Sequence, residues 1–156
     1  MGDRRHTLAR FPVVSTSSLE EARDAVTRVY LPHALRSDGP NLAMQLNAAH
    51  QKRFTLGFLS YGARTELRMP ATESTYHVNL TTRGGTMAER EDGQRAVTAA
   101  DASGVVLLPD QHNTVRWTAD AEQLILKIPR TRLESHLADL IDRTVSGRST
   151  SPSAST

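Results

Sequence analysis

Apolar and polar residues alternate with a period of two along most of the chain between residues 42 and 128. The pattern is clearest over residues 76–81, where polar side chains separate Tyr76, Val78 and Leu80. Such alternation is typical of a strand that buries one face. The other segments with strand-like patterns are residues 42–48, 54–61, 65–69, 87–90, 95–98, 105–108, 115–117 and 124–128.

Turn-forming residues separate these segments at close and even spacing. The pair Asp92-Gly93 lies between two short alternating runs and predicts a hairpin with a type I′ turn, which needs a positive φ at both central positions. Residues 37–40, 83–85 and 107–112 predict further turns. This spacing indicates a mainly β fold, an antiparallel β-barrel or jelly roll. We expect closure into a barrel, because closure removes exposed strand edges.

A helix is predicted in the N-terminal part, after an apolar patch at residues 11–14 that either pairs as an edge strand or lies loose. Ser18 and Glu21 have the spacing of a capping box, in which a hydroxyl and a carboxylate satisfy the first free amides of a helix. Pro32 ends the segment. We expect this helix to pack on the sheet and to carry no chemistry. Its apolar face consists of Leu19, Ala22, Val26 and Val29.

A second helix is predicted from Thr131 onward, because the apolar period changes there from two to that of a helix. Nothing later in the chain covers its apolar stripe, which either packs on the sheet of the same molecule or forms a two-fold interface with a second copy. We expect residues 1–145 to form one domain and residues 146–156, rich in Ser and Thr, to be a disordered tail or the start of a linker. The stripe consists of Leu133, Leu137, Leu140 and Ile141.

Composition narrows the class of protein. The 156 residues correspond to one domain, and the 19 basic and 17 acidic residues are scattered, so no patch indicates nucleic acid or an anionic membrane. No apolar run reaches the length of a membrane span, and residues 1–6 lead into no apolar segment of the kind found in signal peptides, so we expect no secretion signal. The absence of cysteine excludes disulfides, thiolate catalysis and Cys-ligated zinc. These features predict a soluble cytoplasmic protein.

The chain offers little catalytic chemistry. It has six histidines, but none are paired at a metal-ligand spacing. His77 and His112 could converge inside a barrel, with oxygen ligands from residues such as Glu66, yet a catalytic metal usually needs three protein ligands. Oxygen ligands are also available from Gln45 and Asn47. We therefore expect no metal and no cofactor, and polar residues of a binding cavity are the favoured interpretation of these side chains.

Five short segments follow one another in a characteristic order: SLEEAR at 18–23, FLSYGA at 58–63, YHVNL at 76–80, VLLPD at 106–110 and LILKIPRTRL at 124–133. In this order and spacing, residues 14 to 142 resemble the amino-terminal, effector-binding domain of AraC-type transcription regulators. The resemblance implies a cupin-like β-barrel that holds a small-molecule pocket, followed by helices used for dimerisation. In that family a linker then leads to two helix-turn-helix units that bind DNA.

The chain departs from that pattern because it contains no helix-turn-helix pair. It is therefore expected to be either an excised sensor domain or a stand-alone one, with no direct contact to DNA or membrane. The leading hypothesis is a ligand-sensing, homodimerising regulatory domain that is not an enzyme. A small cupin-type metal enzyme and a solidly packed interaction module remain open alternatives.

The residues expected to contact an unknown small-molecule effector fall into two groups. Aromatic side chains would contact apolar or ring-shaped parts of the ligand, and polar side chains would anchor it. The aromatic candidates are Phe58, Tyr61, Tyr76 and Trp117, and the polar candidates are Arg64, His77, Asn79 and His112.

Overall fold

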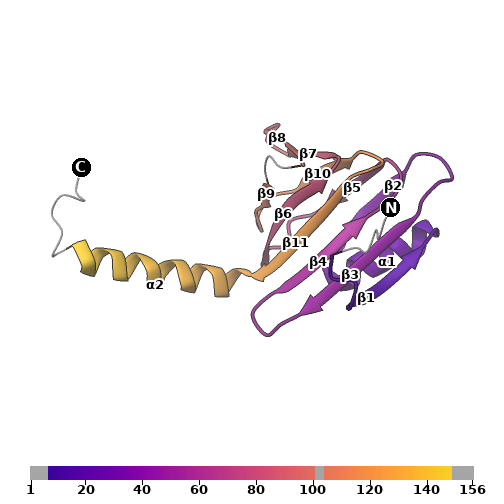
Figure 1. Cartoon of the computed structure of the whole chain (residues 1–156). Coiled ribbons are helices and arrows are strands. Elements are labelled where there is room, and N and C mark those ends of the chain that lie inside the picture. The colour runs from indigo at the N-terminus through magenta and orange to yellow at the C-terminus, as the bar shows by residue number, and fades with distance from the viewer. Residues whose placement is uncertain (1–6, 101–103, 149–156) are drawn as a thin grey trace.

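The computed structural model describes residues 7–100 and 104–148, which form two antiparallel sheets and two helices (Figure 1). The first sheet has six strands in the spatial order β1 (Pro12–Thr16), β3 (Met44–His50), β4 (Thr55–Ser60), β11 (Glu122–Pro129), β6 (Thr75–Arg83) and β9 (Gly104–Leu107). The second has five strands in the order β2 (Ala34–Ser37), β5 (Thr65–Met69), β10 (Asn113–Trp117), β7 (Gly85–Arg90) and β8 (Arg95–Ala99).

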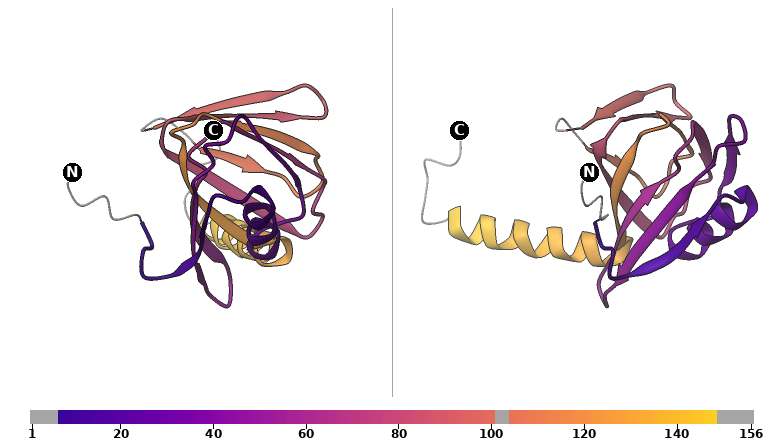
Figure 2. Two further views of the ribbon diagram at one scale, coloured as in Figure 1. Left: turned by 90° about the vertical axis from the view of Figure 1, so that its right-hand side faces the viewer. Right: turned by 45° about the vertical axis from the view of Figure 1, so that its right-hand side comes forward.

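The two sheets pack face to face as a jelly roll (Figure 2). The predicted closure into a barrel is wrong, since no ladder of backbone hydrogen bonds joins the sheets within the described residues. On one side only side chains connect them, as where the hydroxyls of Thr81 on β6 and Thr98 on β8 form a hydrogen bond. Without closure the sheets keep exposed edges, and the strands at these edges are short. Short edge strands are poor templates for pairing with another chain. The edge strands β8 and β9 have five and four residues.

The core forms where the inward faces of both sheets meet. Leu46 and Leu59 from the first sheet and Val115 from the second are at most 1% exposed. Their neighbours along each strand point to the opposite face, as the alternation of the sequence predicts. The core therefore lies between the sheets, and the residues that face into it are set by strand register.

Helix α1 (Leu19–Val29) begins at its predicted cap and covers one end of this core. The hydroxyl of Ser18 accepts a hydrogen bond from the amide of Glu21 at 3.2 Å, while the Glu21 carboxylate accepts one from Thr16 rather than closing the capping box. Tyr30, just after the helix, extends its ring to β4. A Cβ at Gly57 would come within 1.6 Å of the Tyr30 hydroxyl, so only glycine leaves room for that ring.

Helix α2 (Arg130–Arg148) follows β11 directly and extends away from the sheets (Figure 1). Leu133 at its start is half-buried beside the first sheet, but the rest of the apolar stripe is exposed: Leu137, Leu140 and Ile141 are 47%, 41% and 60% exposed. Residues 146–148 of the predicted tail belong to this helix, and residues 149–156 lie outside the described part of the chain. The tail prediction for those last residues is therefore untested.

Two local predictions need correction. The hairpin at Asp92-Gly93 exists between β7 and β8, but only Gly93 has a positive φ (+89°), and its amide bonds the Arg90 carbonyl at 2.9 Å. The turn is thus a type I turn followed by a left-handed glycine, not a type I′ turn. Strand β2 was not predicted at all, because in this short edge strand only Leu35 is buried.

Candidate functional site

A small cavity lies between the two sheets, beneath the C-terminal end of α1. Its free volume is about 20 Å³, enough for roughly one water molecule. Two of its lining residues, His77 and Asn79, are polar and come from the inward face of β6. The apolar lining includes Tyr30, Leu31, Met69, Leu107, Trp117 and Ile125.

His77 is 2% exposed and lies in surroundings that keep its ring neutral. Burial is the main reason that its pKa falls from 6.5 to about 4, and the nearby positive charge of Lys127 lowers it further. A hydrogen bond to the backbone of Tyr30 opposes this shift, and the Tyr30 ring contacts the imidazole edge-on with 6.1 Å between the ring centres. The Nε2 atom of His77 is buried and has no hydrogen-bond partner.

Asn79 lies two residues further along β6, on the same face as His77. Its Nδ2 group donates to Oε1 of Gln123 on the neighbouring strand β11 at 3.1 Å. Its Oδ1 atom is buried and has no partner. Two residues of the cavity wall, His77 and Asn79, therefore each carry one buried polar atom without a hydrogen-bond partner.

Gln123 holds Asn79 in place through a buried network of hydrogen bonds. Its side-chain nitrogen donates to the hydroxyls of Thr81 at 3.1 Å and Thr86 at 3.2 Å, and both hydroxyls bond to that of Thr98. The network connects β11, β6, β7 and β8, so it spans both sheets. Sequence reasoning missed Gln123. The available signal was the period-two alternation of β11. Gln123 lies two positions before the buried Ile125 and therefore faces the same side of the sheet.

The predicted aromatic residue Trp117 lines the cavity, and Tyr61 supports it from behind. Their rings meet edge-on with 5.0 Å between centres, an arrangement that aromatic pairs favour. Tyr61 is fully buried, which raises the pKa of its hydroxyl, and that hydroxyl has no partner among the described residues.

Only three of the eight predicted ligand contacts line this cavity, and Tyr61 and four others do not. Phe58 is buried, but it points away from the cavity because its neighbour Leu59 points into it. Tyr76 likewise faces outward, and its hydroxyl donates to Glu134 at the start of α2 at 3.0 Å. Arg64 borders a depression on the second sheet, and His112 is exposed beside another surface hollow.

The positions of His77 and His112 test the hypothesis that these two residues bind a metal together. His77 lines the interior cavity, whereas His112 borders a hollow near Arg68 and Glu89 on the surface, so the two do not converge. Within the described residues, no group of three or more His, Asp or Glu side chains lies close enough to hold a metal ion.

Comparison with known proteins identifies the family. The model of the AraC-binding-like domain matches residues 22–154. The chain belongs to this family. A probable thc operon regulatory protein of Rhodococcus erythropolis is 30% identical over 128 residues, which cover 79% of this chain and 38% of that protein. The chain therefore spans well under half the length of that relative.

A solved structure supports the fold of this AraC-binding-like domain. The AraC-like transcriptional activator CuxR superimposes with a TM-score of 0.62 at 16% identity, over 88% of this chain and 60% of that one. A cupin superfamily protein of Desulfitobacterium hafniense superimposes with a TM-score of 0.47 at 10% identity, over 60% of this chain and 80% of that one.

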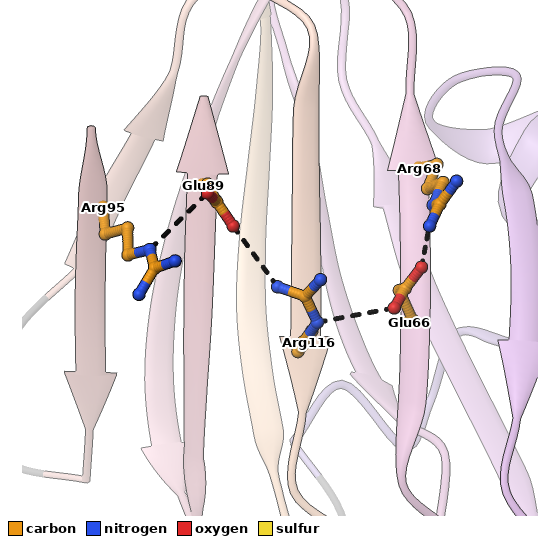
Figure 3. Close-up of polar contacts among 5 residues, drawn as sticks. All are labelled: Glu66, Arg68, Glu89, Arg95 and Arg116. Atoms are coloured by element: carbon orange, nitrogen blue, oxygen red, sulfur yellow. Dashed lines mark hydrogen bonds and ion pairs between the residues drawn. The ribbon is translucent and has the colours of Figure 1, made fainter. Parts of the chain in front are cut away.

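The outer face of the second sheet of this AraC-binding-like domain carries a row of alternating charges (Figure 3). Arg116 lies between Glu66 and Glu89, with nitrogen–oxygen distances of 3.4 and 3.5 Å. Arg68 pairs with Glu66 at 2.8 Å, and that hydrogen bond lowers the pKa of the Glu66 carboxyl. Arg95 pairs with Glu89 at 3.5 Å.

A depression of about 580 Å³, lined in part by Glu66 and Arg116 of this row, is larger than the interior cavity. Of the two acidic residues in its lining, Asp38 and Glu66, Glu66 is already paired with Arg116 of the same face. The interior cavity is the better candidate for specific binding, since it holds buried polar atoms that no protein group satisfies. No helix in the described part of the domain has the length and apolar character needed to cross a membrane.

Proposed function

We propose that this AraC-binding-like domain senses a small-molecule effector, forms a homodimer through α2, and serves a transcription regulator rather than an enzyme. The observation that carries the sensing role is the pair of buried atoms without partners, His77 Nε2 and Asn79 Oδ1, on the wall of the interior cavity. Buried polar atoms are normally satisfied, and a ligand is one way to satisfy them. The similarity to a probable operon regulatory protein and to a transcriptional activator supports the same role.

The cupin-enzyme alternative has no supporting observation. The cavity lining contains one histidine and no acidic residue, so it offers neither a metal-ligand set nor a pair of catalytic carboxylates. Contact with DNA is not proposed for these residues.

A metabolite screen tests the sensing role. Trp117 is the only tryptophan in the chain and lines the cavity, so its fluorescence reports binding at this site directly. A ligand at one hundred times its Kd should stabilise the protein by about 2.7 kcal/mol, which raises the Tm by roughly 5–10 °C for a domain of this size. A ligand that raises the Tm and leaves the Trp117 fluorescence unchanged would place the binding site elsewhere and contradict the proposal.

Dimerisation is proposed because α2 exposes its apolar stripe beside an apolar groove. The groove, about 800 Å³, lies between the start of α2 and the outer face of the first sheet. Leu56, Leu126 and Ile128 contribute its apolar floor. A second copy related by a two-fold axis would cover both the stripe and the groove, because each copy presents the same surface to the other.

Leu137→Asp should convert the dimer to a folded monomer. Burial of a leucine is worth about 1.5–3 kcal/mol, and a two-fold interface contains two copies of it. Light scattering should show half the wild-type mass, with an unchanged circular dichroism spectrum, since Leu137 is outside the core. Asp142→Arg, which lies about 140° around α2 from Leu137 at 3.6 residues per turn, is the control and should remain dimeric. A Leu137→Asp protein that also remains dimeric would place the interface elsewhere.

A further inference from the structure

We infer that the outer face of the first sheet is the surface that receives α2 of a second copy, so that two copies exchange these helices across a two-fold axis. This inference rests on the proposed dimerisation and names the surface against which the exposed stripe of α2 packs. Three features support it: the apolar character of the outer face, the fixed direction of α2, and the matching lengths of the helix and of the strand beneath it.

The outer face of the first sheet is apolar across five strands. Leu80 and Val106 are 48% and 49% exposed on it, and no charged side chain occupies its outward positions 76, 78 and 80 on β6 or 124, 126 and 128 on β11. An antiparallel sheet that meets water on one side is normally polar on that side, as the second sheet is (Figure 3). The first sheet therefore presents the kind of surface that marks a protein interface. One row of this face consists of Val106, Val78, Leu126, Leu56 and Ala49.

The helix of the same molecule does not cover this face. α2 begins directly after the last residue of β11, so no loop lets it turn back over the sheet (Figure 1). The amide of Arg130 donates to the carbonyl of Ser74 at 2.7 Å. The hydroxyl of Tyr76 on β6 donates to Glu134 at 3.0 Å. These contacts hold the first turn of α2, and the exposed part of its stripe lies beyond them.

A second copy supplies a helix of the right length. The 19 residues of α2 cover about 28 Å, and the eight residues of β11 cover about 27 Å. We take the helix of the second copy to run antiparallel to β11 with the ends aligned. Its Leu137, about 10 Å from the start of α2, then lies over Leu126, about 10 Å from the end of β11. Its Ile141 lies over Leu124 in the same way, about 16 Å from each of these ends.

A two-fold exchange covers both apolar surfaces of both copies. Each copy carries one exposed stripe and one apolar face, so the exchange leaves none of the four uncovered. A helix about 28 Å long and about 10 Å wide covers about 280 Å² of a sheet. Two such contacts, each of which buries surface on both copies, hide about 1,100 Å² in total, and a specific interface needs roughly 1,000 Å². Helices that paired only with each other would leave the sheet face uncovered.

Leu80→Glu tests the exchange, because Leu80 pairs with Leu124 at the end of the face remote from the start of α2. The Kd of the dimer should rise at least about a hundredfold, since the exchange would bury two carboxylates against apolar side chains. Light scattering over a concentration series measures the Kd, and circular dichroism checks the fold. Val97→Glu is the matched control on the outer face of the second sheet. Val97 is 72% exposed, and its substitution should change the Kd by less than about threefold.

Cross-linking reports the same contact without a buried charge. The chain has no cysteine, so Leu80→Cys and Ile141→Cys each introduce a single thiol. An equal mixture of these two variants, treated with a short bismaleimide, should give a cross-linked heterodimer that mass spectrometry identifies. Leu137→Cys should not cross-link to itself, because the exchange keeps the two copies of this residue about 20 Å apart.

The outcomes separate the exchange from dimerisation itself. A folded Leu80→Glu protein with the wild-type Kd would overturn the exchange, and so would the absence of a cross-linked product from the mixture. Self-cross-linking of Leu137→Cys would show that the helices pair with each other, so the exchange would be wrong while the proposed dimerisation stood. A wild-type protein that is monomeric at every concentration would contradict both proposals. The cross-linking is decisive even if Leu80→Glu does not fold.

Discussion

Gln123→Ala should lower the free energy of unfolding by about 4 kcal/mol, among the largest effects expected of any single substitution in this domain. Gln123 is 0% exposed and bonds Asn79, Thr81 and Thr86. Its removal leaves buried groups unsatisfied, each at a cost of about 1–3 kcal/mol, and it opens a cavity that the neighbouring strands cannot fill. Urea denaturation monitored by circular dichroism measures the change.

Two further variants separate the hydrogen bonds from the packing. Gln123→Met retains most of the side-chain volume, so its cost of about 2–3 kcal/mol would come from the lost hydrogen bonds. Gln51→Ala makes the same change at an exposed position and should stay within about 0.5 kcal/mol of the wild type. If Gln123→Met were as stable as the wild type, the network would not be stabilising, and the rigid placement of Asn79 would lose its basis.

Most strands could be predicted because each buries one face and so alternates in sequence. The strand predicted at residues 65–69 matches β5, and residues 19–29 form the capped helix expected there. Alternation shows which residues share a face, but it does not show which strands pair. Closure into a barrel was predicted because it would remove exposed strand edges, and the sequence holds no signal that β8 and β9 remain unpaired with each other.

The candidate site was predictable only in part. Tyr76 and His77 are neighbours on one strand, so only one of them can face the interior, and local sequence does not decide which. The structure turns His77 inward and leaves Tyr76 at the base of α2. Arg64 and His112 lie beside turns, where position depends on contacts far away in the sequence. Which of these residues meet at one cavity is thus a property of the tertiary structure.

Acidification should destabilise the protein through His77. Its pKa is about 4 in the folded state against an ordinary value of 6.5, mainly because the ring is buried. Between these two values the unfolded chain binds more protons than the folded one, so stability falls as the pH falls from about 6.5 to about 4. At 1.36 kcal/mol for each pKa unit, the loss between pH 7 and pH 4 is about 3 kcal/mol.

The comparison with His77→Gln isolates this effect from other groups that titrate over the same range. Burial also lowers the pKa of His33, and the carboxyl of Glu66 has a lowered pKa. The total loss of unfolding free energy of the wild type on acidification should therefore exceed the part that is due to His77. Urea denaturation at a series of pH values should give a free energy of unfolding that falls by about 3 kcal/mol less in His77→Gln than in the wild type. His112→Gln replaces an exposed histidine and should follow the wild-type curve. Parallel curves for the wild type and His77→Gln would mean that His77 is not held neutral in the fold.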